Sequence, residues 1–181
     1  MNTPPPALLT ALAALLIAVA VERLVEFRLS ARHGRALAAR GAIEHGRSHF
    51  ILFVVLHALW PVALALEVLI GGARPGRAWP LWLAAFGLAQ VLRFSAIRAL
   101  GERWTTRVIV LPGAALVRRG PYRFMRHPNY VAVLIELIAA PLLFGAWRTA
   151  IAATAFNLAA LAIRVRVEER ALASTPQPPR L

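Results

Sequence analysis

The sequence predicts an all-α, polytopic membrane protein with about five transmembrane helices. Of its 181 residues, 59% are hydrophobic, whereas soluble domains contain roughly 45–50% apolar residues. The mean hydropathy is +0.62. The apolar runs are spread along the whole chain, and arginines gather between them. We therefore expect residues 1–181 to form a single integral-membrane domain.

Five apolar segments predict the helices. They are Ala7–Val21, Phe50–Ile70, Trp79–Leu100, Asn129–Phe144 and Trp147–Ile163. A helix rises about 1.5 Å per residue, so the third segment spans the roughly 30 Å hydrocarbon core of a bilayer easily, while the shorter fourth one needs its flanking residues. Gly145 and Ala146 predict a tight turn, which makes the last two segments an antiparallel helical hairpin.

The first segment has a second interpretation as a cleavable signal peptide, because Ala18-Val19-Ala20 resembles a signal-peptidase site. A signal peptide carries positive charge before its apolar region. Met1 to Pro6 has none, whereas the residues after the segment are rich in arginine. We expect an uncleaved span, continued by Glu22 to Arg28 as an amphipathic, interfacial stretch.

Charge is distributed unevenly between the two sides of the predicted bundle. All 21 basic residues are arginine, all 8 acidic residues are glutamate, and the formal net charge is +13. Seventeen arginines fall on one side, three on the other, and Arg93 lies within the third segment. The positive-inside rule places the N-terminus outside and the C-terminus in the cytoplasm. Because this accounts for the charge, we expect no nucleic-acid partner.

The absence of cysteine limits the kinds of site that the chain can form. The chain contains no cysteine, which excludes disulfides and cysteine-ligated metals, and we expect no metal site.

Ionisable side chains inside the predicted spans need an explanation, because a charge at the middle of a membrane helix costs about 2.5–3.5 kcal/mol. Four such residues are His57, Glu67, Arg93 and Glu136. Arg93 has the alternatives of pairing with Glu136 or extending to the cytoplasmic face. His57 has the alternative of a hydrogen-bonded core residue, and Glu67 that of an interfacial one. Glu136, about two turns into the fourth span, indicates a site role.

The densest polar cluster joins the arginine-rich loop to the fourth helix, between Gly120 and Tyr130. Pro128 suits the first turn of that helix, with His127 extended before it. The free N–H groups and the positive dipole end of the helix favour an anion beside Arg126 and His127. A carboxylate fits this description.

A second polar cluster closes the fifth helix, where Arg164 and Glu168 are one turn apart and Glu169 follows. Alone, it is an ion pair worth roughly 0.3–0.5 kcal/mol. Together with the loop cluster, it offers cations for a carboxylate and carboxylates for an ammonium group. A zwitterionic cofactor requires both.

These features form one combined pattern: Gly120-Pro121-Tyr122, Arg126-His127-Pro128-Asn129-Tyr130, Glu136, and Arg164 with Glu168-Glu169. The pattern resembles the isoprenylcysteine carboxyl methyltransferase family of integral-membrane enzymes, most strongly from about Leu100 to Leu172. Arg-His-Pro-x-Tyr alone also resembles phospholipid N-methyltransferases and sterol reductases. The Glu-Glu pair after a short helical hairpin makes the resemblance more specific.

The resemblance implies a site for S-adenosylmethionine, built by residues of about 100–172, with a lateral opening for a lipid acceptor. Arg164 and Glu169 are implied near the transferred methyl group, with Arg164 orienting the acceptor. The implied cofactor-binding residues are Arg126, His127, Pro128, Tyr130, Glu136 and Glu168.

The N-terminal half resembles a small bacterial subgroup in Glu22 to Glu26, residues 41–46, His49 and His57. That subgroup is associated with type III polyketide synthases and O-methylates alkylpyrones or alkylresorcinols. The resemblance implies the bacterial inner membrane, an active site facing the cytoplasm and a functional link to such a synthase. His49, His57 and Arg93 become candidate substrate residues.

Other functions stay open at this point. A phospholipid or small-thiol methyltransferase would use the same cofactor, a sterol-type reductase would bind NADPH, and a transporter or scaffold would have no catalytic site. A disordered tail is expected over about residues 174–181, where prolines recur.

Overall fold

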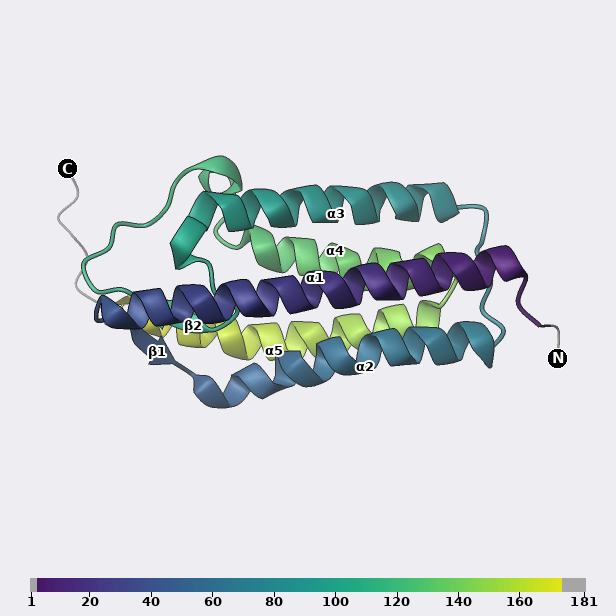
Figure 1. Ribbon diagram of the computed structural model, residues 1–181, viewed down its shortest axis with the longest axis horizontal. Helices are drawn as coiled ribbons and strands as arrows, with labels where there is room; N and C mark the ends of the chain where they lie inside the picture. Colours follow the sequence, from purple (N-terminus) through teal and green to yellow (C-terminus); the bar gives the residue numbers. More distant parts are fainter. Residues whose placement is uncertain (1–2, 174–181) are drawn as a thin grey trace.

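Five α-helices of the described residues run back and forth along the long axis of the molecule (Figure 1). The computed structural model describes residues 3–173, and the predicted tail lies outside them. The helices are α1 (Pro6–Ala39), α2 (Phe50–Leu69), α3 (Trp79–Leu100), α4 (Pro128–Leu143) and α5 (Trp147–Ala173).

The helix lengths confirm an integral-membrane protein. Within residues 3–173, four helices are long and apolar enough to cross a membrane, and α4 is shorter, with 16 residues. α1 is the longest, with 34 residues. At roughly 1.5 Å per residue it extends about 50 Å and projects well beyond a hydrocarbon core of about 30 Å.

The core of the bundle combines large side chains of α2 with small side chains of α3 and α4. Trp60 and Leu64 of α2 are almost completely buried. Ala89 and Ala96 of α3 and Ala132 of α4 have no exposed surface. Small residues let membrane helices approach closely, and α3 packs along most of α4.

The turn between α4 and α5 depends on Gly145. Its φ is +73°, and a Cβ atom there would lie 2.0 Å from the backbone oxygen of Arg74, in the segment between α2 and α3. Glu67 strengthens this end of the molecule. Its carboxylate accepts hydrogen bonds from the backbone N–H groups of Arg148 and Thr149, at 3.1 and 2.7 Å, and thereby caps the start of α5.

Two short strands join the loops at the opposite, arginine-rich end. β1 (Ile43–His45) pairs antiparallel with β2 (Val108–Val110), with Glu44 opposite Ile109. Ala171 near the end of α5 packs against β2. The pairing connects the segment after α1 to the long α3–α4 loop and holds that loop beside α5.

Candidate functional site

A cavity of about 1210 Å³ opens at the arginine-rich end and reaches into the bundle. All five helices contribute to its lining, and residues 103–118 of the α3–α4 loop provide a large part of it. Typical ligand pockets measure about 300–1,000 Å³. The cavity is therefore large enough for two ligands side by side.

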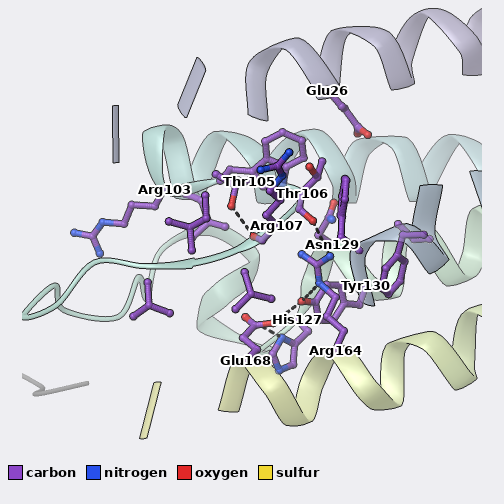
Figure 2. A pocket seen from close by; sticks show the side chains of 18 of the residues that line it. Glu26, Arg103, Thr105, Thr106, Arg107, His127, Asn129, Tyr130, Arg164 and Glu168 are labelled. Atoms are coloured by element: carbon purple, nitrogen blue, oxygen red, sulfur yellow. Dashed lines mark hydrogen bonds and ion pairs between the residues drawn. The ribbon is translucent and has the colours of Figure 1, made fainter. Parts of the chain in front are cut away.

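Arg164 of α5 lies at the centre of the lining (Figure 2). Its Nε donates to the Tyr130 hydroxyl at 2.8 Å, and its Nη1 donates to the backbone oxygen of Thr106 at 2.7 Å. The guanidinium also lies 5.2 Å from the centre of the Phe53 ring. Arg164 is only 8% exposed. Its guanidinium is therefore held in place by these contacts and has little contact with solvent.

Tyr130 connects Arg164 to two further side chains. Its hydroxyl donates to the Glu168 carboxylate, and its ring stacks on His127 at 4.9 Å between centres. His127 Nδ1 lies 3.9 Å from the same carboxylate. We call His127, Tyr130, Arg164 and Glu168 the site cluster; Figure 2 shows the four side chains together. The sequence predicts a direct Arg164–Glu168 ion pair, but the Tyr130 hydroxyl lies between the two side chains and hydrogen-bonds to both.

The remaining predicted site residues are divided: His57 and Arg93 also line the cavity, whereas others lie at its rim or outside its lining. Arg126 and Glu169 line it and are exposed. Pro128 is buried at the first turn of α4. His49 is 8% exposed and lies beside Gly46, outside the lining. Burial lowers the pKa of His49, and the positive charge of Arg164 lowers it further.

Glu136 and Arg93 belong to a different group of contacts, which joins α1, α3 and α4. Arg93 donates to Glu26 at 3.1 Å, lies 3.4 Å from Glu22 and contacts Glu136. Arg23 lies 2.8 Å from Glu26 and 3.4 Å from Glu136. We call these five residues the charge network. Glu136 is 1% exposed and outside the cavity lining, so the fold does not bring it to the site cluster.

The charge network also changes the interpretation of the middle of α1. The sequence predicts an interfacial stretch from Glu22 to Arg28, but Glu26 is 7% exposed and faces the bundle. The physical reason is Arg93, which is 1% exposed. A buried guanidinium needs carboxylate partners, and α1 provides two of them.

Several lining residues were missed by the sequence analysis. Asn157 is a polar residue inside an apolar span, but it is not ionisable, so the criterion that selected His57 did not select it. Thr106 contributes its backbone oxygen, which no residue type signals. Tyr122 was named only as part of the family-like pattern and was not assigned to the site. It lines the cavity, and its pKa is raised by burial and then by the negative charge of Glu168.

Comparison with known proteins agrees with the geometry. The family model described as isoprenylcysteine carboxyl methyltransferase (ICMT) family matches residues 82–174. The uncharacterized protein YpbQ of Bacillus subtilis is 38% identical over 160 residues, which cover 87% of this chain and 95% of that protein. An uncharacterized protein of Haemophilus influenzae is 31% identical over 151 residues, 83% of this chain and 88% of that protein. No solved structure is significantly similar.

Proposed function

Because the chain belongs to the isoprenylcysteine carboxyl methyltransferase family and is thus a membrane methyltransferase, we propose that it transfers a methyl group from S-adenosylmethionine to an oxygen of a lipophilic acceptor. The observation that carries the proposal is the site cluster. It presents a guanidinium, an imidazole and a carboxylate to one large cavity.

The polar groups of the cavity fit the charges of the cofactor. The N-terminus of α4 with Arg126 and His127 suits the cofactor carboxylate, and Glu168 suits its ammonium group. Asn129 offers a further contact, because its Oδ1 is buried, lines the cavity and has no hydrogen-bond partner within residues 3–173. An amino group of the cofactor would satisfy it.

Arg164 is proposed to orient the acceptor oxygen. Its contacts to Tyr130 and Thr106 use two of the five N–H donors of a guanidinium. The remaining donors are available to an oxygen in the cavity. Glu169, an exposed residue of the same helix, is proposed to lie near the transferred methyl group.

The bound cofactor supplies an activated methyl group on a sulfonium. The chain contributes alignment, for which effective molarities reach about 10⁵ M or more, and exclusion of water. Residues 103–118 supply the wall over the site that excludes water. Pro128 fixes the start of α4, and we assign Glu136 and Arg93 to the support of the bundle.

The lipid side of the cavity supports a lipophilic acceptor. Leu24 and Phe27 of α1 and Val54 of α2 line it, yet they are 50%, 54% and 43% exposed. Exposed apolar side chains of a membrane helix face lipid. We propose that the acceptor reaches the cavity laterally between α1 and α2.

The biological setting is proposed on the charge pattern and the subgroup resemblance. The arginine-rich end, where the cavity opens, is assigned to the cytoplasmic face of a bacterial inner membrane. The acceptor is assigned to the alkylpyrone or alkylresorcinol type, made by a type III polyketide synthase. A phospholipid or thiol acceptor would use the same cofactor site, and product analysis distinguishes these acceptors.

Cofactor binding tests the proposed function directly. Detergent-purified protein is titrated calorimetrically with S-adenosylhomocysteine, and NADPH serves as the control ligand. We expect micromolar binding of S-adenosylhomocysteine and no heat from NADPH. Binding of NADPH alone would show that the site serves a reductase instead.

A further inference from the structure

The inner end of the cavity contains a side-chain amide whose N–H groups have no hydrogen-bond acceptor among the described residues. Asn157 of α5 is 1% exposed and lines the cavity. Within residues 3–173, its Nδ2 group has no hydrogen-bond partner. A buried donor that stays unpaired is unfavourable, so its place in the cavity lining indicates a ligand that accepts a hydrogen bond from it.

His57 of α2 presents a complementary group to the same cavity. Its Nδ1 lies 2.8 Å from the backbone oxygen of Phe53. A carbonyl oxygen only accepts, so Nδ1 carries the hydrogen of the neutral ring and Nε2 carries a lone pair. Nε2 has no partner among the described residues, which leaves it free to accept a hydrogen bond from a ligand.

Both residues lie deeper in the bundle than Arg164. Phe53, whose ring lies under the Arg164 guanidinium, precedes His57 by one turn of α2, and α2 runs inward from the arginine-rich end. Asn157 precedes Arg164 by two turns of α5, about 10 Å along the helix. A ligand head group that reaches past Arg164 therefore meets His57 and Asn157.

We infer that His57 and Asn157 form a specificity subsite for an uncharged acceptor head group that carries a hydroxyl and a second oxygen. The hydroxyl donates to His57 Nε2, and the second oxygen accepts from Asn157. The inference rests on the proposed function for the methyl transfer. The hydroxyl that His57 holds is distinct from the oxygen that Arg164 orients for methylation.

This subsite separates two classes of acceptor. A phenol hydroxyl carries a hydrogen that it can donate to the lone pair of Nε2. A carboxylate is already ionised and has no hydrogen to donate. It would therefore leave Nε2 without a hydrogen bond. The contacts therefore favour a phenol with a second oxygen on its ring over a carboxylate.

Ligand binding in the absence of turnover tests the subsite. The protein is titrated with 5-pentylresorcinol and with its dimethyl ether, both with and without saturating S-adenosylhomocysteine. The variants are Asn157→Leu, which keeps the side-chain size, and His57→Phe. Thr154→Val is the matched control, because Thr154 Oγ1 is also buried on α5 without a partner in the described chain but lies outside the cavity lining.

We expect the wild-type protein to bind the diol at least tenfold more tightly than the ether. Asn157→Leu should weaken diol binding about tenfold, His57→Phe should abolish the preference over the ether, and Thr154→Val should change neither. Asn157→Leu should not lower the unfolding temperature, because it removes an unpaired buried donor.

Two results would overturn the inference. One is equal binding of diol and ether by the wild-type protein, and the other is unchanged diol binding by Asn157→Leu. If the wild-type protein does not bind S-adenosylhomocysteine, the proposed function is contradicted instead. The titrations of diol and ether without S-adenosylhomocysteine would still decide whether the subsite exists.

Discussion

The charge network and the site cluster are two ionic groups in one small bundle, and they treat their arginines differently. Arg93 contacts three carboxylates, whereas Arg164 is held by a tyrosine hydroxyl and a backbone oxygen. Carboxylates neutralise the cation that they position. Neutral oxygens position a cation and leave its charge available, so Arg164 can still attract an anion or a developing negative charge.

The largest effect is expected when the charge network is broken. Arg93→Met leaves two buried carboxylates, Glu26 and Glu136, and the half-buried Glu22 with Arg23 as their remaining partner in the network. This change should lower the free energy of unfolding by about 3–5 kcal/mol. Denaturant unfolding in detergent measures this loss. The double variant Arg93→Met/Glu136→Leu should recover part of it. Wild-type stability in Arg93→Met would mean that the network does not support the fold.

The site cluster should show the opposite pattern, with activity lost and stability kept. Arg164→Ala removes the group that orients the acceptor and should lower kcat about 10²–10³-fold, while the protein remains folded and extractable. Methyl transfer from radiolabelled S-adenosylmethionine measures it. Arg166→Ala, an exposed change on the same helix, is the control. Undiminished turnover in Arg164→Ala would refute its assigned role.

A smaller effect tests whether a neutral partner keeps the charge available. Tyr130→Phe removes the hydroxyl between Arg164 and Glu168. The two charges can then pair directly, which should weaken S-adenosylhomocysteine binding about tenfold, or ~1.4 kcal/mol. Calorimetry measures the affinity, and Tyr122→Phe, at another position of the cavity lining, serves as the comparison. Equal affinities in wild type and Tyr130→Phe would contradict the expectation.

The smallest effect concerns a contact between α1, which carries three residues of the charge network, and the loop that holds Arg164. Ser30 of α1 accepts from the backbone N–H of Thr106 at 2.9 Å, and the Thr106 oxygen holds Arg164. Ser30→Ala should lower the unfolding free energy by about 1 kcal/mol and reduce turnover by about threefold, since ~0.65 kcal/mol corresponds to that factor. Unfolding and activity are both measured. Ser95→Ala, an exposed change in α3, should alter neither quantity.

The apolar spans could be predicted from the sequence, because a membrane demands long apolar runs. The helices themselves are longer in two cases: α1 continues past Val21 to Ala39, and α5 continues past Ile163 to Ala173. The predicted segment Trp79–Leu100 coincides with α3, and the turn at Gly145 occurs where expected. β1 and β2 were not expected, since three residues carry no clear alternation. The membership of His127, Tyr130, Arg164 and Glu168 in one site came from family resemblance rather than from spacing.

The remaining differences come from contacts between residues far apart in the chain. Glu26 faces inward because it meets Arg93, 67 residues later, and no local pattern around Glu26 reveals this. Thr106 holds Arg164 through its backbone, so its side chain gives no signal. Asn157 could have been selected as a polar residue inside a span, but only the cavity shows what it faces.

The continuous α1 helix contacts both the bundle core and the loop that lines the cavity. Its N-terminal half contributes Leu12 and Val19 to the bundle core. Its C-terminal half holds the α3–α4 loop through Ser30 and through His33, whose ring nitrogen lies 2.8 Å from the Trp104 oxygen. A helix longer than the bilayer tilts as the bilayer becomes thinner. Such a tilt would shift the loop that holds Arg164, which makes the thickness of the surrounding membrane a determinant of turnover.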